Sequence, residues 1–305
     1  MKRLRLVLGI ITSLLSASAL SASDGQRLQV VSLHPLIGEL AREVGGERVQ
    51  VNDLLRPGDD PHWFEPSPGQ MQELRTARLI LASGKGMEPY LPSLRKVLSN
   101  KQSLVEIGER VPSLIVGQDS ALFVCCPAHS VGGIDPHWWH SPDAMRRATR
   151  IMADALAEVD PGHRAYYLQR AQAHQQRLAD LRKWAQQQLT KVPRQQRVLV
   201  TAHAAFGYFC RDFGFQSLPL VGLSGDEDPD PKHLAESYEE IKKRGIRAVF
   251  PEENANPRIL ENLARSTGAT VGRPLLADGT GRGALATYEG MMRHNVAAII
   301  EALAR

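Results

Sequence analysis

Short apolar runs alternate with amphipathic stretches over the first half of the chain. Four runs have the length and composition of buried strands, and they are predicted at 28–33, 49–55, 79–82 and 103–107. Segments with helical spacing separate them, and they are predicted at 35–44, 68–76 and 88–98. Strands joined by helices of this length are typical of βαβ units, so an α/β lobe with a mainly parallel sheet is expected.

The period of the pattern changes in the middle of the chain. Helices are predicted at 142–159 and 161–192, and the second has Asp160 as N-cap and Pro161 at its first position. At roughly 1.5 Å per residue, about 30 helical residues span ~45 Å, more than a small domain needs. We interpret this helix as a rigid strut between two lobes. A heptad oligomerisation helix is the alternative, and it is disfavoured because Gln and His interrupt the apolar stripe.

The alternation of strands and helices returns in the last third of the chain. Strands are predicted at 197–201, 218–222, 248–250 and 270–275. Helices are predicted at 206–213, 231–244, 257–267 and 285–303. The predicted fold class is therefore α/β, with two parallel-sheet α/β lobes joined by one long rigid helix. The predicted division is 23–159 for the N-terminal lobe, 160–192 for the linker helix and 193–305 for the C-terminal lobe.

The first 22 residues have the layout of a secretory signal. Lys2, Arg3 and Arg5 precede the apolar run 6–15, and small residues follow at 16–23. This run is too short to span a hydrocarbon core of ~30 Å, and no cysteine follows it that could carry a lipid. The sequence therefore predicts a cleaved, non-lipidated signal peptide at 1–22 and a periplasmic protein.

Composition narrows the class of partner. Removing residues 1–22 lowers the formal net charge from +4 to +1, because the segment carries three basic residues and no acidic ones. Clustered Lys and Arg on one element are missing, so nucleic acid is not an expected partner. No later stretch is apolar enough for a transmembrane helix. Cys125, Cys126 and Cys210 allow one disulfide at most in an exported chain, and the pairing is left open.

The most informative feature is an Asp-Pro-His sequence that occurs twice. Asp60-Pro61-His62 lies in the loop after a predicted strand, and Asp135-Pro136-His137 lies just before a predicted helix. Proline stiffens the backbone ahead of each imidazole, and the aromatic residues that follow shield the ring. A histidine on such a loop is well placed to be a metal ligand. A surface histidine near a turn is the alternative for one copy, and the repetition disfavours it.

Two further candidates follow strands of the second lobe. His203 comes two residues after the strand at 197–201, and Asp278 comes after the last predicted strand. Ligands of open α/β sheets bind at the carboxyl ends of the strands, so both side chains are expected to face the crevice between the lobes. His62 and His137 would approach from one lobe, and His203 and Asp278 from the other.

Four segments together carry a resemblance to a known family. They read DPHWFEPSP from Asp60, DPHWW from Asp135, HAAFGYF from His203 and LLADGTG from Leu275. In order and spacing the chain resembles the zinc- and manganese-binding cluster of ABC-transporter solute-binding proteins, over essentially the whole mature length. The resemblance implies that His62, His137, His203 and Asp278 hold a metal between two lobes. It also implies delivery of the metal to a membrane permease, without catalysis.

The donor set and the resemblance both favour zinc as the transported ligand. Three imidazoles and one carboxylate suit tetrahedral Zn²⁺, whereas Mn²⁺ prefers more oxygen ligands. Manganese members of the family usually have a glutamate where His203 stands. Mn²⁺ or Fe²⁺ on the same fold is the alternative. Zinc members often carry an acidic residue after the third histidine, and this chain has Ala204, so a carboxylate that orients the imidazole must come from elsewhere.

Several other residues are weighed as contributors to the site. Cys125, Cys126 and His129 could form an accessory metal site, but a structural role is favoured. His34 and His140 are expected near the crevice without being primary ligands. Glu252 and Glu253 follow a strand and could orient an imidazole, although a plain loop role is favoured for Glu253.

Two rival functions remain open at this point. A zinc hydrolase would keep one metal position open for water beside a general base, but no HExxH helix is present and Glu65 is the only obvious base. A metal chaperone or adhesin could use the same fold without a transporter.

We expect the protein to be a monomer. We expect the lobes to move little when metal binds, because a long helix resists bending. We also expect acid to release the metal, since imidazoles must be deprotonated to coordinate.

Overall fold

The computed structural model describes residues 27–56, 58–99, 101–119, 121–124, 130–224, 230–253 and 255–304. The predicted signal segment 1–22 lies outside the described residues, and so do Cys125, Cys126 and His129 of the suggested accessory site. Within the described ranges, no helix has both the length and the apolar character needed to cross a membrane.

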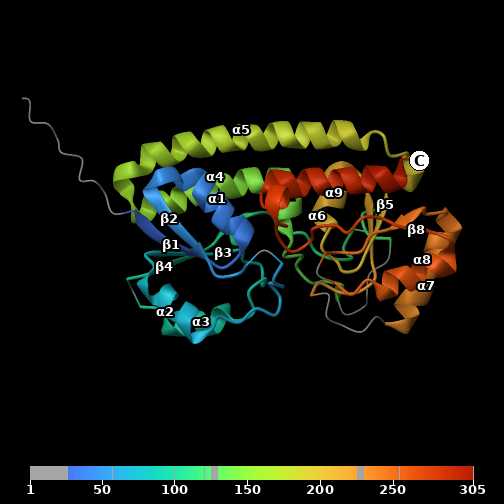
Figure 1. The fold of residues 1–305 in the computed structure, drawn as a ribbon, viewed down its shortest axis with the longest axis horizontal. Coiled ribbons are helices and arrows are strands. Elements are labelled where there is room, and N and C mark those ends of the chain that lie inside the picture. Colours follow the sequence, from blue (N-terminus) through green and yellow to red (C-terminus); the bar gives the residue numbers. More distant parts are fainter. Residues whose placement is uncertain are drawn as a thin grey trace, which may run out of the picture.

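The N-terminal lobe is a four-stranded parallel sheet in the order β2-β1-β3-β4. Its strands are β1 (Leu28–Ser32), β2 (Val49–Asp53), β3 (Leu79–Ala82) and β4 (Ser103–Glu106). Helix α1 (Pro35–Gly45) covers one face of the sheet, and α2 (Pro68–Thr76) and α3 (Leu91–Val97) cover the other (Figure 1). Neighbouring residues therefore enter different cores: Val30 packs with the α1 side and Val31 with the α2 side. Burial of both faces explains why the central strands β1 and β3 contain consecutive apolar residues, whereas the edge strands β2 and β4 are only partly buried.

The C-terminal lobe repeats the parallel alternation in two short pairs of strands, β5-β6 and β7-β8. The strands are β5 (Val198–Thr201), β6 (Gln216–Pro219), β7 (Ala248–Val249) and β8 (Thr270–Val271). The helices are α6 (Gly207–Phe213), α7 (Pro231–Arg244), α8 (Arg258–Thr267) and α9 (Tyr288–Leu303). A parallel bridge between Thr201 and Phe250 connects the two pairs.

The last predicted strand, 270–275, is interrupted in the structure. Strand β8 ends at Val271, and a separate bridge pairs Leu275 with Glu252. Pro274 has no N–H to donate to a ladder, and Gly272 weakens a strand, so pairing resumes only at Leu275. This interruption leaves the residues after Leu275 free to turn towards the other lobe.

A layer of three helices lies across both lobes. It consists of α4 (Pro142–Val159), α5 (Arg164–Leu189) and α9, with α5 running along the outer side (Figure 1). The predicted start of the long helix is corrected, because residues Pro161–His163 form a 3₁₀ turn and α5 begins at Arg164. One continuous core contains Leu79 of the first lobe and Leu199 of the second. The predicted fold class is confirmed, with the long helix packed along both lobes.

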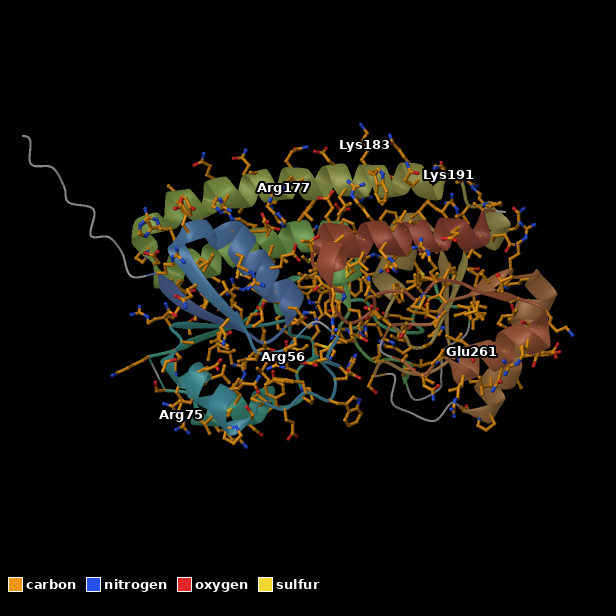
Figure 2. The ribbon with its side chains drawn as sticks, in the orientation of Figure 1. Arg56, Arg75, Arg177, Lys183, Lys191 and Glu261 are labelled. Atoms are coloured by element: carbon orange, nitrogen blue, oxygen red, sulfur yellow. The ribbon has the colours of Figure 1, made fainter. Side chains whose placement is uncertain are left out.

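The inner face of α5 is buried within this chain. Its buried residues are Tyr167, Ala171, His174, Leu178, Leu181, Ala185 and Leu189. They pack where α5 meets α1, α4 and α9, whereas Lys183 is exposed and projects from the outer side of the helix (Figure 2). The apolar stripe that an oligomerisation helix needs is therefore already covered, and the strut interpretation is the better one.

Candidate metal centre

Four ligating side chains converge between the lobes. His62, His137, His203 and Asp278 each offer one atom, and these atoms all lie within 4.8 Å of one another. Nε2 of His137 lies 3.2 Å from Nε2 of His62 and 3.3 Å from Nε2 of His203. Oδ1 of Asp278 lies 3.3 Å from Nε2 of both His137 and His203 and 3.5 Å from Nε2 of His62. The structure thus brings together all four residues that the sequence nominates.

Two of the four donors come from loops that carry an aspartate. His62 lies in the loop after β2, and its backbone N–H donates to Oδ1 of Asp60 over 2.9 Å. His137 is fully buried at the start of a 3₁₀ turn, and its backbone N–H and its Nδ1 both lie 2.9 Å from Oδ1 of Asp135. A carboxylate only accepts, so Nδ1 of His137 carries the proton and the lone pair of Nε2 faces the other donors.

His203 is oriented by the same device with a partner from a distant segment. It follows β5, and Glu252 accepts hydrogen bonds from its backbone N–H at 3.0 Å and from its Nδ1. Both side chains are 3 % exposed, so water cannot replace this contact. The Nε2 lone pair of His203 therefore also points at the centre. Ala204 stands where many zinc-binding members have an acidic residue, and Glu252 provides the orienting carboxylate in its place. The expectation that this carboxylate comes from elsewhere in the chain agrees with this contact.

Asp278 is the fourth donor, and its surroundings indicate that a cation belongs between the four donor atoms. Its Oδ1 is buried and has no hydrogen-bond partner among the described residues. Burial opposes the charged carboxylate, but the positive charge that His203 carries when its ring is protonated holds the pKa of Asp278 well below its usual range. A carboxylate oxygen and imidazole lone pairs that face one another repel unless a cation lies between them. The donor chemistry therefore fits a divalent metal.

The spacing of the donors fits a tetrahedral ion. Ligand atoms at ~2.0–2.1 Å from a tetrahedral Zn²⁺ lie about 3.3 Å from one another. The four donor atoms are three imidazole nitrogens and one carboxylate oxygen. Nε2 of His137 lies 3.2 Å from Nε2 of His62, and 3.3 Å from both Nε2 of His203 and Oδ1 of Asp278. Five of the six separations between the four donor atoms are 3.2–3.5 Å and all six lie within 4.8 Å, so these side chains can surround one small cation after a modest shift.

The sequence of this chain matches a known protein family over nearly its whole length. The family model described as zinc-uptake complex component A, periplasmic, matches residues 30–302. The chain belongs to this family. Its members are the metal-binding components of ABC transporters that act outside the cytoplasm with a membrane permease, so the family is one of transport proteins and not of enzymes.

Relatives within the family are named for different metals. The manganese-binding lipoprotein MntA of Bacillus subtilis (strain 168) is 31% identical over 288 residues, which cover 92% of this chain and 91% of that protein. The iron-binding protein YfeA of Yersinia pestis is 25% identical over 291 residues, covering 93% and 90%. The solved structure of the periplasmic zinc-binding protein TroA from Treponema pallidum matches with a TM-score of 0.81 and 28% identity, covering 92% of this chain and 100% of that one.

Two more imidazoles lie beside the four donors of this family member without joining them. Nε2 of His34 is 3.1 Å from the backbone oxygen of Asp278, and Nε2 of His140 is 2.8 Å from that of Ala277. Burial lowers the pKa of His34 to about 4 and that of His140 to about 3, so both rings are neutral near pH 7. The expectation that neither is a primary ligand agrees with these contacts.

Two carboxylates that orient the ligands, Asp135 and Glu252, could not be assigned this role from the sequence alone. Asp135 is part of the Asp-Pro-His motif, and its position two residues before His137 is a local signal for the contact that it makes. Glu252 and Glu253 both follow a strand, and the structure separates their roles: Glu252 is buried against His203, whereas the side chain of Glu253 is exposed, in agreement with the loop role favoured for it. Only folding decides which of two adjacent carboxylates faces inward.

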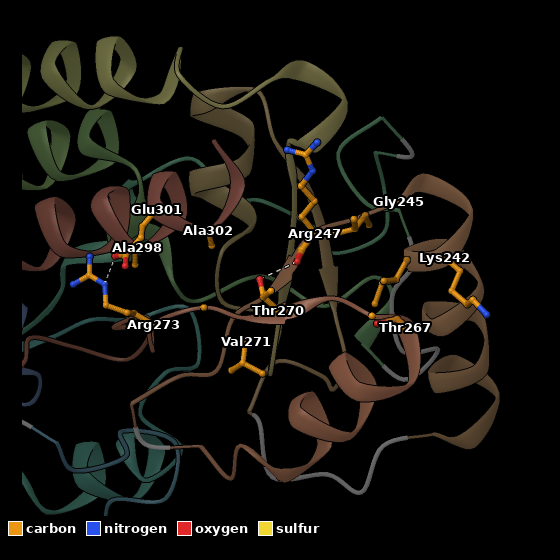
Figure 3. Close-up of a pocket in the computed structure, with 14 residues that line it drawn as sticks. Lys242, Gly245, Arg247, Thr267, Thr270, Val271, Arg273, Ala298, Glu301 and Ala302 are labelled. Carbon is orange, nitrogen blue, oxygen red and sulfur yellow. Dashed lines mark hydrogen bonds and ion pairs between the residues drawn. The ribbon is translucent and has the colours of Figure 1, made fainter. Parts of the chain in front are cut away.

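An open cavity in the C-terminal lobe is unrelated to the metal centre. It has a volume of about 640 Å³ and lies where the ends of α7 and α8 meet β8 and α9. Arg273 and Glu301 at its edge pair with each other over 2.8 Å, and Thr270 donates to the backbone of Arg247 (Figure 3). It lacks histidine and cysteine among its lining residues, so it offers no alternative donor set.

Proposed function

We propose that this chain captures Zn²⁺ through His62, His137, His203 and Asp278 and delivers it to the permease of an ABC importer. The observation that carries the proposal is the convergence of three Nε2 atoms and one carboxylate oxygen at tetrahedral spacing. Nitrogen-rich four-donor sites suit Zn²⁺ better than Mn²⁺, which prefers more oxygen ligands. Carboxylates behind His137 and His203 raise ligand basicity and fix the ring direction.

Transport of Mn²⁺ or Fe²⁺ by the same site is the second candidate. It is supported by the names of two relatives, one manganese-binding and one iron-binding. The donor set argues against it, because those ions favour oxygen-rich shells of higher coordination number. Zinc hydrolysis has less support, since catalytic zinc needs a position open to water. Glu65, the one base candidate of the sequence, is exposed on its loop.

Location and assembly belong to the same proposal. A cleaved signal peptide at 1–22 without a lipid-bearing cysteine would release the mature chain into the periplasm. A monomer is proposed because the apolar stripe of α5 is buried within the chain. The predicted lobe boundaries at 159–160 and 192–193 remain a proposal as well.

Native mass spectrometry of protein isolated from the periplasm tests the cargo. We expect one zinc per chain, and loss of the metal in His137→Ala and His203→Ala. His163→Ala is the matched control, because its ring pairs with Asp160 near the start of α5 and not with the four donors. Manganese or iron as the bound ion would support the second candidate, and equal zinc content in all variants would refute the site.

Uptake measurements test the importer role separately. Deletion of the gene should reduce zinc uptake at low external zinc, and the wild-type chain should restore it while His203→Ala should not. Unchanged uptake after deletion would remove the transporter role and favour a chaperone or adhesin. The binding experiment and the uptake experiment can therefore fail independently.

A further inference from the structure

The loop that carries Asp278 is held by side chains of the opposite lobe. Ring N–H groups of Trp139 and His140 both point at the backbone oxygen of Ala277, at 3.0 Å and 2.8 Å. His34 adds a third contact, from Nε2 to the backbone oxygen of Asp278 at 3.1 Å. All three residues belong to the part of the chain before α5, whereas Asp278 follows β8.

The directions of these hydrogen bonds are fixed by chemistry. A carbonyl oxygen only accepts, so each ring nitrogen that faces one must carry the proton. Nδ1 of His34 accepts from the backbone N–H of Leu36 at 3.3 Å, which leaves Nε2 as the donor. Nδ1 of His140 is buried without a hydrogen-bond partner among the described residues, so the bond to Ala277 is the one that this ring makes there. Three neutral donors therefore converge on two consecutive carbonyls.

The residues just before these carbonyls are held by the C-terminal lobe. The backbone oxygen of Leu275 accepts from Glu253 at 3.1 Å. Leu276 exchanges two hydrogen bonds with the side chain of Asn295 on α9, both at 2.9 Å. The backbone is therefore bonded to the C-terminal lobe up to Leu276 and to the N-terminal lobe at Ala277 and Asp278. Ala277 is the residue just before Asp278, whose carboxylate belongs to the metal centre.

Ordinary packing does not require this arrangement. A buried imidazole costs desolvation energy, and an apolar side chain of similar size would fill the space of His140 without leaving Nδ1 unsatisfied. Trp139 makes two hydrogen bonds to the C-terminal lobe. Its ring N–H donates to Ala277, and its backbone oxygen accepts from the hydroxyl of Tyr288 at 2.9 Å. The polar contacts are concentrated on the segment that presents Asp278, which indicates that its placement is what they secure.

We infer that His34, Trp139 and His140 are positioning residues of the metal centre: their ring N–H groups, here called the 277–278 clamp, fix the backbone of Asp278 so that its carboxylate meets the ligands of the N-terminal lobe. The inference rests on the proposed ligand set. It also changes how the four ligands divide between the lobes, because the clamp fixes Asp278 relative to His62 and His137 of the N-terminal lobe. His203 is then the one ligand of the four that is held by the C-terminal lobe alone.

Substitutions at two clamp positions, with one matched control, test the inference. Trp139→Phe removes the ring donor and keeps most of the ring, and His140→Leu removes the other donor to Ala277. We expect zinc affinity, measured by competition with a chromophoric chelator, to fall about tenfold or more in each. Trp138→Phe is the control, because Trp138 is the buried neighbour and donates to Ser83 of its own lobe at 3.2 Å. Equal affinities in Trp139→Phe and Trp138→Phe would overturn the inference.

A double-mutant cycle separates positioning from general stability. If the clamp acts through Asp278, Trp139→Phe should weaken zinc binding in the wild-type chain and have little further effect in Asp278→Ala. The same loss in both backgrounds would show a merely structural role and refute the clamp. His140→Gln, whose amide can donate from nearly the same place, should recover part of the affinity lost in His140→Leu, and no recovery would count against the clamp.

A spectroscopic readout makes the test independent of affinity. Co²⁺ bound in place of zinc should show the strong d–d absorption of a four-coordinate site in the wild-type chain. In Trp139→Phe this absorption should change towards that of Asp278→Ala, and an unchanged spectrum would refute the clamp. If Asp278→Ala itself leaves zinc affinity and the Co²⁺ spectrum unaltered, the proposed ligand set fails, which is a result distinct from failure of the clamp.

Discussion

Glu252 receives both hydrogen bonds that fix the direction of His203, one from the backbone N–H and one from Nδ1 of the ring. The two residues are 49 positions apart in the chain and both lie at the carboxyl ends of strands of the C-terminal lobe. Because Glu252 holds the proton on Nδ1, the Nε2 atom keeps its lone pair for a metal. The pair therefore couples the fold of this lobe to the chemistry of the site.

The first prediction concerns this carboxylate. Glu252→Gln should lower zinc affinity by about 10- to 100-fold, because the ring loses a charged acceptor that raises its basicity and fixes its orientation. Competition with a chelator of known affinity measures the change. Glu253→Gln is the control, since the adjacent side chain is exposed. Equal affinities in the two variants would show that Glu252 does not support the ligand.

The same pair shows where sequence reasoning stops. The two Asp-Pro-His motifs could be found because the proline, the aspartate and the imidazole lie within three residues. His203 and Asp278 could be found because strand ends face the crevice in open parallel sheets. The partner of His203 is set by the parallel arrangement of β5 and β7, a tertiary relationship that no local pattern contains.

The boundaries of the elements show a similar limit. The long helix was predictable from its apolar stripe, whose members are the buried residues of α5. Its first turn was not, because Pro161–His163 adopts a 3₁₀ turn although the residues suit an α-helical start. Roles of His34 and His140 were also beyond reach, since composition gives the residue type but not the direction of a ring nitrogen. What a pattern cannot encode is which distant backbone group a polar side chain meets.

The second prediction uses a close approach behind His137. A Cβ atom added at Gly207 would lie 2.7 Å from Oδ2 of Asp135 and 2.7 Å from a methyl carbon of Leu114. Gly207→Ala should displace Asp135, lower zinc affinity and cost about 1–3 kcal/mol in the free energy of unfolding. Gly162→Ala is the control, because nothing lies within 4 Å of the added atom. Chemical denaturation and zinc competition measure both effects, and parallel behaviour of the two variants would contradict the prediction.

The third prediction links the metal to stability. A ligand that binds only the folded chain stabilises it by ~2.7 kcal/mol at a free concentration of about 100 times Kd. Zinc should therefore raise the Tm of the wild-type chain by about 5–8 °C in a calorimetric scan. His203→Ala should lose most of this increase, whereas His163→Ala should keep it. An equal increase in His203→Ala would place zinc elsewhere on the protein.

The fourth prediction concerns a carboxyl group where the lobes meet. Oε2 of Glu39 on α1 accepts from the backbone N–H of Tyr288, the first residue of α9, at 2.7 Å. Burial raises the pKa of Glu39 to about 7, and the carboxylates of Glu43 and Asp53 add to the increase while the hydrogen bond and Arg42 oppose it. A pKa raised on folding means that protonation favours the folded chain. The stabilisation is complete below the unfolded pKa of about 4.5 and is lost as the pH rises through about 7.

Glu39→Gln should therefore remove a pH dependence of stability that the wild-type chain has. Between about pH 5.5 and about pH 8 the wild-type chain should lose ~2 kcal/mol of unfolding free energy relative to Glu39→Gln. Urea denaturation of both proteins with a chelator present measures the difference, so that metal binding does not contribute. Glu289→Gln is the control, because Glu289 lies at the exposed start of α9 and pairs with Arg293. If the difference between wild type and Glu39→Gln were independent of pH, the carboxyl group would not titrate in this range, and its burial beneath α9 would carry no proton linkage.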